Sequence, residues 1–225
     1  TNCTVLEHHG LEADDLIAGW IQHHPNNNHV IISTDTDFYQ LLAPNVKQYN
    51  GVTEELHTLD GIFDKNGKPV IDNKTKQPKV VPDPKWMLFE KIIRGDSTDN
   101  IMSAYPGVRK KGSKNKVGLI EAFEDRDTQG YAWNNLLLSR WTDHNGEEHR
   151  VKDVYERNKT LIDLSAQPPE IKSLISEVVT KNMVEKDVQQ VGARMLRFCR
   201  IYDLKRISDN ITYYVDPFNA KYNGN

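Results

Sequence analysis

Three short clusters of carboxylates are the residues of this sequence best suited to chemistry. They read Glu12-Ala13-Asp14-Asp15, Ser33-Thr34-Asp35-Thr36-Asp37 and Gly95-Asp96-Ser97-Thr98-Asp99-Asn100. Each cluster alone has a structural explanation, because acidic side chains cap helices and order tight turns. Together, and without His or Cys among them, they offer the hard oxygen ligands that Mg²⁺ and Mn²⁺ prefer.

The elements around the first two clusters predict how these carboxylates meet. The apolar run His29–Ser33 predicts a buried parallel strand, and Leu11–His24 shows helical spacing after a short predicted strand at Cys3–Glu7. Strand-to-helix loops of a parallel sheet lie along one edge, so we expect both clusters there. Two ions bound at that edge would clamp the attacking and leaving oxygens of a phosphodiester.

The rest of the chain predicts an α/β part followed by a helical part. The first part continues with a short helix at Asp37–Leu42, a strand at Val46–Tyr49, a hairpin or extended insertion at 51–83 and a helix at Pro84–Arg94. Further helices are predicted at 117–123, 131–139, 151–162, 170–181, 186–197 and 202–211. We therefore predict one domain over residues 1–95, a helical domain over 96–215 and a frayed tail over 216–225.

A dense basic run follows the third acidic cluster. Arg109-Lys110-Lys111-Gly112-Ser113-Lys114-Asn115-Lys116 carries five positive charges in eight residues. Such side chains grip the DNA backbone irrespective of base sequence, and glycines and helix N–H groups let the backbone approach phosphate. A solvated loop is the alternative, but directly after an acidic cluster a DNA-backbone clamp is the better interpretation.

Composition excludes several classes of protein. The net charge is −3 over 225 residues with 27% charged residues, which is typical of a globular chain. No stretch approaches the ~20 apolar residues of a membrane span, and no basic-then-apolar leader indicates secretion. Cys3 and Cys199 stand far apart and form no metal-binding spacing, so we expect a cytoplasmic protein.

The ordered acidic motifs resemble those of the 5′-nucleases of the flap endonuclease superfamily. These include the 5′-nuclease domain of bacterial DNA polymerase I and, most similar, the RNase H of T-even-like phages. Tyr105–Glu121 resembles the helix–turn–helix clamp of the family, and Arg157–Leu164 resembles a later phage-type segment. The resemblance implies a partial PIN-like or Rossmann-like parallel-sheet nuclease core followed by a helical region with this clamp. It also implies that the N-terminal part, with two further strands, their Asp ligands and the arch, is missing.

The resemblance further implies two bound ions, Mg²⁺ or Mn²⁺. Glu12, Asp14 and Asp35 resemble ligands of the first ion, with Asp15 adjacent. Asp37, Asp96 and Asp99 resemble direct or water-mediated ligands of the second. The residues that correspond to the duplex-binding turn, longer and more basic here than in the family, are Gly107, Gly112, Lys114 and Lys116, flanked by Arg109, Lys110 and Lys111.

The implied activity is a structure-specific 5′-3′ exonuclease or flap endonuclease that hydrolyses RNA primers or DNA flaps in replication. The implied partners are a DNA or RNA–DNA duplex with a 5′ end or flap, and replication proteins. The complete enzyme is expected to be a monomer in the cytoplasm of a phage-infected bacterial host. This chain alone is expected to bind metal and DNA weakly and to be incomplete as a catalyst.

Three other functions fit part of the sequence. A non-catalytic, structure-specific DNA-binding module would keep the clamp without cutting. A phospho-receiver domain would use Asp14, Asp15 and Asp35 but would leave the third cluster unexplained. A nucleotide-sugar transferase would rest on Asp35-Thr36-Asp37 alone.

Overall fold

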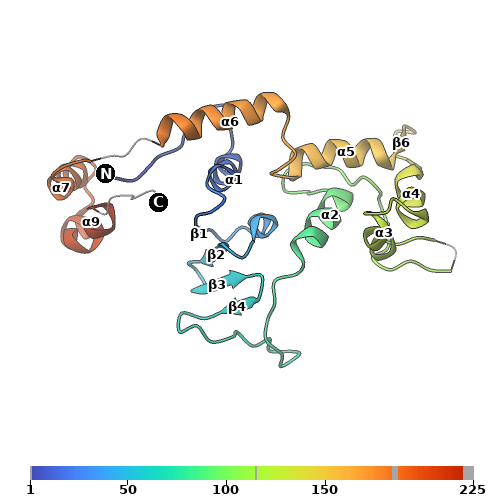
Figure 1. Cartoon of the computed structure of the whole chain (residues 1–225), viewed down its shortest axis with the longest axis horizontal. Coiled ribbons are helices and arrows are strands. Elements are labelled where there is room, and N and C mark those ends of the chain that lie inside the picture. The colour runs from blue at the N-terminus through green and yellow to red at the C-terminus, as the bar shows by residue number, and fades with distance from the viewer. Residues whose placement is uncertain (1, 115, 184–186, 220–225) are drawn as a thin grey trace. The chain divides into compact units, whose positions relative to one another are not determined.

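The structure is a computed structural model that describes residues 2–114, 116–183 and 187–219 (Figure 1). The chain divides into two compact units, Thr1–His23 with Ser173–Asn225, and His24–Lys172. The predicted domain limits at residues 95 and 215 do not coincide with this division and stay a prediction. Among the described residues, no helix has both the length and the apolar character needed to cross a membrane.

A four-stranded sheet lies in the His24–Lys172 unit. Its order is β1 (His29–Ile32), β2 (Val46–Asn50), β3 (Glu55–Thr58) and β4 (Gly61–Phe63). The β1–β2 pair is parallel, whereas β2–β3 and β3–β4 are antiparallel. The mixed α/β class is confirmed. Parallel pairing is limited to β1–β2, because residues 51–63 fold back as an antiparallel hairpin.

The predicted buried strand at His29–Ser33 is present but only half buried. Ile31 is 6% exposed, whereas Val30 is 56% and Ile32 is 78% exposed. The reason is that successive side chains of a strand point to opposite faces, and only the face with Ile31 is packed. The strand predicted at Cys3–Glu7 is absent: residues 2–8 form neither helix nor strand, and Val5 is 59% exposed.

The segment after β4 begins with a tight turn. Asp64 accepts hydrogen bonds from the backbone N–H groups of Asn66, at 2.8 Å, and Lys68, at 2.9 Å. Gly67 has a φ of +74°, a conformation that glycine adopts without strain. The hairpin or extended insertion predicted over 51–83 is thus confirmed as a β3–β4 hairpin followed by an extended arm.

Helices α2 to α5 complete this unit. They are α2 (Pro84–Arg94), α3 (Leu119–Asp125), α4 (Tyr131–Leu138) and α5 (Val151–Ile162). Asp83 caps α2 and Pro84 occupies its first turn, which is why the predicted limits of this helix are confirmed. A hairpin of β5 (Arg140–Thr142) and β6 (Glu148–Arg150) was not predicted, since its strands are three residues long and polar.

The core of this unit joins the four helices. Its buried members are Phe89, Ile93, Ala104, Leu119, Ala122, Leu136, Leu137, Val151 and Val154. Tyr155 packs against this cluster, with its ring 5.7 Å from the Trp133 ring. Because α2 contributes Phe89 and Ile93 to the core, the residues at its C-terminal end are anchored to a rigid element.

The other unit is helical. It contains α1 (Ala13–His23), most of α6 (Pro169–Asn182), α7 (Val191–Ile201), α8 (Lys205–Ser208) and α9 (Ile211–Asn219). A Cβ on Gly19 of α1 would meet Ile175 of α6 at 2.1 Å, so the glycine permits close packing of these helices.

Three sequence predictions for this helical unit differ from the structure. The helix predicted over 186–197 begins at Val191, with part of the predicted segment outside the described residues. The helix predicted over 202–211 is replaced by α8 and α9, which are separated by Asp209 and Asn210. Helix α9 continues to Asn219 through the predicted tail, of which residues 220–225 lie outside the described part.

Candidate metal centre and basic loop

The second acidic cluster spans the turn after β1 and the first turn of the 3-10 helix η1 (Thr36–Leu41). Asp35 is the N-cap of η1, and its Oδ1 accepts the backbone N–H of Asp37 at 2.9 Å. Gln48 of β2 is 1% exposed and donates its side-chain amide to the carbonyls of Ser33, at 2.9 Å, and Asp35, at 2.7 Å. A buried side chain thus holds the turn in shape while the Asp35 carboxylate stays exposed.

The third acidic cluster begins where α2 ends. Gly95 has a φ of +73°, and a Cβ there would meet the Ile101 carbonyl oxygen at 2.3 Å. Asp96 and Ile101 exchange backbone hydrogen bonds of 2.9 and 2.7 Å, which closes the loop between them. Glycine is therefore required where the chain leaves the helix, and the closed loop fixes the direction of Asp96.

Asn158 of α5 holds both sides of this loop. Its side chain is fully buried and donates to the carbonyls of Ile92, at 2.9 Å, and Met102, at 2.8 Å. Asn158 falls in the phage-type segment singled out in the sequence, but its role there was not predicted. An uncharged residue inside a helix carries no signal of a tertiary hydrogen bond.

The two loops bring three carboxylates together. Oxygen atoms of Asp37, Asp96 and Asp99 lie within 4.8 Å of one another. The Nζ atom of Lys91, from the last turn of α2, lies 2.5 Å from Asp37 Oδ2 and 2.7 Å from Asp96 Oδ2. Sequence reasoning missed Lys91, because a basic residue in the last turn of a helix is ordinary.

Electrostatics keep this arrangement charged. Burial lowers the pKa of Lys91, but the hydrogen bonds that Lys91 donates to Asp37 and Asp96 outweigh burial and leave that pKa raised. The hydrogen bond from Lys91, followed by those from Thr98, holds the pKa of Asp96 well below its usual range. With Asp99 nearby, the described cluster carries more negative than positive charge, which favours binding of a cation.

The first acidic cluster belongs to the other unit. Glu12 immediately precedes α1 and is exposed, and its backbone N–H lies 3.4 Å from Asp15 Oδ2. Asp15 is thus engaged with the beginning of its own helix, whereas Asp14 occupies the first turn. That Glu12 and Asp14 share an ion with Asp35 stays a prediction.

The basic run forms a closed loop in front of α3. Glu121 accepts the backbone N–H groups of Gly112, at 3.0 Å, and Gly118, at 3.1 Å. A Cβ on Gly112 would meet the Lys116 carbonyl oxygen at 2.5 Å, so this glycine serves loop closure. Described residues 96–114 and 116–118 contain no helix, and α3 follows them, so the predicted helix–turn–helix clamp stays a prediction.

The backbone of this loop uses the beginning of α3 itself. The N–H groups of Leu119 and Ile120 donate to the carbonyls of Arg109, at 3.0 Å, and Lys110, at 2.9 Å. Those N–H groups are thereby occupied, contrary to the expectation that they bind phosphate. The exposed side chains of the basic run remain available to a polyanion.

The basic side chains point to solvent beside an open cleft. Arg109, Lys110, Lys111, Lys114 and Lys116 are all exposed. Lys110 is partly engaged, with its Nζ 5.3 Å from the centre of the Trp86 ring. The cleft has a volume of about 440 Å³ and is lined by Tyr105, Pro106, Gly107, Val108, Arg109, Gly112, Ser113, Lys116, Val117, Asn135 and Leu136.

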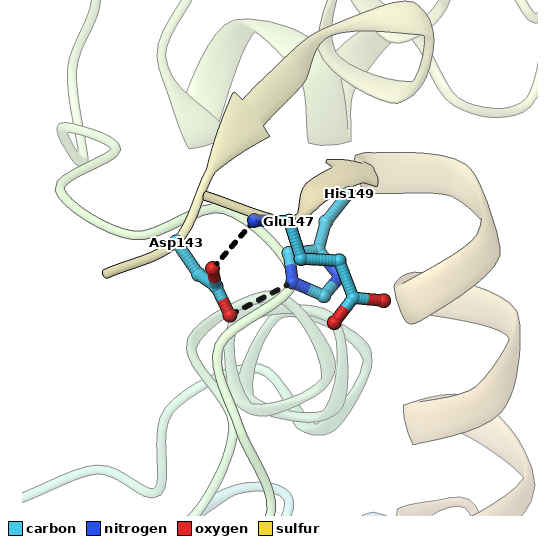
Figure 2. Close-up of side chains that lie close together, drawn as sticks. All are labelled: Asp143, Glu147 and His149. Atoms are coloured by element: carbon cyan, nitrogen blue, oxygen red, sulfur yellow. Dashed lines mark hydrogen bonds and ion pairs between the residues drawn. The ribbon is translucent and has the colours of Figure 1, made fainter. Parts of the chain in front are cut away.

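A second group of metal-type side chains lies in the β5–β6 hairpin, as Figure 2 shows. Asp143 Oδ1 accepts the backbone N–H groups of Asn145 and Glu147, each at 2.9 Å, and its Oδ2 lies 3.4 Å from His149 Nε2. The same Asp-X-Asn-Gly pattern forms the turn at Asp64, where no histidine follows. Turn formation therefore accounts for Asp143, and Glu147 is exposed.

Comparison with known proteins gives sequence relatives and structural neighbours. No family model matches the chain. A DNA polymerase I of Rhizobium leguminosarum is 30% identical over 165 residues, which are 72% of this chain and 13% of that protein. A DNA polymerase I of Caldicellulosiruptor bescii is 32% identical over 130 residues, 54% of this chain and again 13% of the relative. The chain thus spans 13% of the length of the curated relatives it matches.

Among solved structures, the T5 D15 protein co-crystallized with metal ions is 19% identical, with a TM-score of 0.45 over 78% of this chain and 62% of the other. T5 5′-exonuclease with bound zinc is 19% identical, with a TM-score of 0.44 over 77% and 60%. A closest relation to the RNase H of T-even-like phages stays a prediction. The ordered acidic motifs resemble those of the 5′-nuclease domain of DNA polymerase I. The sequence matches to DNA polymerase I confirm the resemblance of this chain to the 5′-nuclease superfamily.

Proposed function

We propose that this chain is part of a divalent-metal-dependent 5′-nuclease that hydrolyses phosphodiesters at a 5′ end or flap. The observation that carries the proposal is the convergence of Asp37, Asp96 and Asp99, from two separate loops, around the ammonium group of Lys91. An ammonium group held between Asp37 and Asp96 supports the proposal that these carboxylates can hold a cation. The similarity to DNA polymerase I connects this site with phosphodiester chemistry.

Two Mg²⁺ or Mn²⁺ ions fit the donor set, which consists of carboxylate oxygens. Asp37, Asp96 and Asp99 would hold one ion, and Asp35, exposed after the end of β1, would contribute to the other. Ions in such a centre supply an activated water and neutralise charge on the phosphate. The residues of this chain hold the carboxylates in place: Gln48 orders the first loop and Asn158 the second.

The basic loop would hold the nucleic acid. Lys114, Lys116 and Arg109 are exposed and lie in or beside the open cleft, so they are suited to phosphates of a DNA or RNA–DNA duplex. We propose that this loop and α3 together act as the duplex clamp. A role in replication with other replication proteins, a monomeric complete enzyme and a location in the cytoplasm of a phage-infected bacterium belong to the same proposal.

Asp35→Asn tests the proposal. Asparagine still caps η1, because its amide oxygen accepts the same N–H, so the substitution removes charge and keeps the turn. We expect the apparent Kd for Mn²⁺ to rise about tenfold, which corresponds to about 1.4 kcal/mol, and cleavage of a 5′-flapped duplex by the complete enzyme to be lost. Titration calorimetry and a gel assay with 5′-labelled DNA measure the two effects.

Asp127→Asn is the matched control, since Asp127 is exposed and outside the cluster. Unchanged Mn²⁺ binding and cleavage in Asp35→Asn would contradict the metal role. Tight binding of flapped DNA without cleavage, even when the N-terminal part of a 5′-nuclease is supplied, would instead identify a non-catalytic DNA-binding module.

A further inference from the structure

The proposed metal chemistry assigns no role to Lys91, although its side chain lies among the clustered carboxylates. Its Nζ lies 2.5 Å from Asp37 Oδ2, 2.6 Å from Asp37 Oδ1 and 2.7 Å from Asp96 Oδ2. The three side chains are 24%, 28% and 16% exposed, so water screens these contacts only in part. One ammonium group therefore occupies oxygen atoms on two of the three clustered carboxylates.

The surroundings make Lys91 the movable member of this group. Asp37 follows a turn ordered by Gln48, and Asp96 lies in a loop closed by its exchange with Ile101. The backbone of Lys91 is fixed as well, because neighbouring Ile92 and Ile93 are buried. Its four-carbon side chain, however, has freely rotating bonds and carries a compact charge at its end.

A divalent ion and this ammonium group compete for the same oxygens. Coordination of Mg²⁺ or Mn²⁺ requires carboxylate oxygens at about 2.0–2.2 Å, and a cation held there would repel an ammonium group a few ångströms away. An ion that coordinates the oxygens now in contact with Lys91 would therefore displace its ammonium group.

We infer that Lys91 is a built-in counter-ion of the Asp37–Asp96 pair, which a divalent ion has to displace. Lys91 keeps the two carboxylates from repelling one another while no metal is bound, and it weakens metal affinity by the strength of the contacts that are lost. This inference rests on the proposed metal centre and adds a positioning residue that sets its affinity.

Lys91→Met tests the inference, because methionine keeps an unbranched side chain of similar length without the charge. We expect the apparent Kd for Mn²⁺ to fall about fivefold, as estimated from the strength of a partly exposed ion pair. We also expect a lower melting temperature without metal, because the carboxylates are left unpaired, and a difference from the wild type that closes as MnCl₂ is added. Titration calorimetry with Mn²⁺ and melting curves measure both effects.

Two further variants serve as controls. Lys85→Met removes an exposed lysine from the same helix and should bind Mn²⁺ like the wild type. Lys91→Arg keeps the positive charge and should not gain affinity. If Lys91→Met does not fold without metal, Lys91→Gln, which retains a hydrogen-bond donor, takes its place in the same titration.

The outcomes separate this inference from the proposed function. Mn²⁺ binding by Lys91→Met that is equal to or weaker than wild-type binding would overturn the counter-ion role and leave the metal centre standing. No Mn²⁺ binding by either protein would overturn the metal centre and the inference together. Tighter binding that also appears in Lys85→Met would show a general charge effect and likewise overturn the inference.

Discussion

Uncharged, buried residues shape this candidate site as much as its carboxylates do. Gln48 and Asn158 each donate hydrogen bonds from the side-chain amide to two backbone carbonyls, and both residues are 1% exposed or less. Each bond satisfies a carbonyl that would otherwise be costly to bury. The geometry of Asp35, Asp37 and Asp96 therefore depends on residues with no chemistry of their own.

Tyr155 allows a pH-dependent test of the core behind the site. Burial, followed by the charges of Glu156 and Asp163, raises the pKa of Tyr155 to about 12 from the usual 10.0 of a tyrosine side chain. Between these values the unfolded chain releases the proton and the folded protein keeps it. The contribution of the neutral ring to stability is thus complete below pH 10 and is lost as the pH rises toward 12.

We expect Tyr155→Phe to match the wild type closely at pH 7 and to become the more stable protein above pH 10, by up to roughly 2–3 kcal/mol. Urea unfolding of both proteins at pH 7, 10 and 11.5 measures this difference. Tyr131→Phe is the control for loss of the hydroxyl itself, because Tyr131 is 80% exposed. A constant difference at all three pH values would mean that Tyr155 is not buried as described.

At the scale of elements, the basic loop and α3 form one structural unit. Glu121 holds Gly112 and Gly118, and the carbonyls of Arg109 and Lys110 occupy the first N–H groups of the helix. The described residues on both sides of the loop are thereby tied to α3, while its lysines at 110, 111, 114 and 116 are exposed. Such an element presents charge at defined positions, which suits a regular phosphate backbone.

Replacing Lys114 and Lys116 by Ala should weaken binding to unrelated duplexes about equally, because phosphates carry no base identity. Each lost phosphate contact flattens the plot of log affinity against log salt by roughly 0.9, so the double variant should change the slope by just under about 2. Binding titrations at several salt concentrations on two unrelated duplexes measure the slope. The matched control replaces Lys68 and Lys74 by Ala, because both lysines are exposed and lie on the arm after β4.

An unchanged slope in the Lys114 and Lys116 variant would mean that the basic run is a solvated loop that does not contact phosphates. An equal change in the Lys68 and Lys74 variant would show that net charge, rather than the loop, governs binding.

At the scale of the whole molecule, the predicted ligands are divided between two compact units. Glu12 and Asp14 belong to one unit, whereas Asp35, Asp37, Asp96 and Asp99 belong to the other. The second unit holds a clustered site by itself, formed by Asp37, Asp96 and Asp99. A metal that binds the folded chain and not the unfolded chain stabilises the molecule by mass action.

We therefore expect Mg²⁺ or Mn²⁺ to raise the melting temperature. An ion at about ten times its Kd adds ~1.4 kcal/mol of stability, which corresponds to roughly 3–6 °C for a chain of this size. Melting curves in MgCl₂ and in NaCl of equal ionic strength separate coordination from screening. A melting temperature that does not change in millimolar Mg²⁺ would contradict a preformed metal site.

Local signals in the sequence determined much of the secondary structure. The limits of α2 and α5 are as predicted, because Pro84, Gly95 and the spacing of apolar residues act within one or two helical turns. The strands β1 and β2 and the hairpin after residue 51 also agree with their local patterns. The order of the acidic motifs was sufficient to identify the resemblance that the DNA polymerase I matches confirm.

Only the tertiary structure decided which groups meet. Lys91 lies 54 residues from Asp37 in sequence, and Asn158 lies 66 residues from Ile92, so no local pattern predicts these contacts. The half-exposed state of β1 and the absence of a strand at Cys3–Glu7 likewise depend on which partners a segment finds. Periodicity, caps and turns are properties of neighbouring residues, whereas ion pairs and burial arise only when separate elements pack together, and packing is a property of the folded chain as a whole.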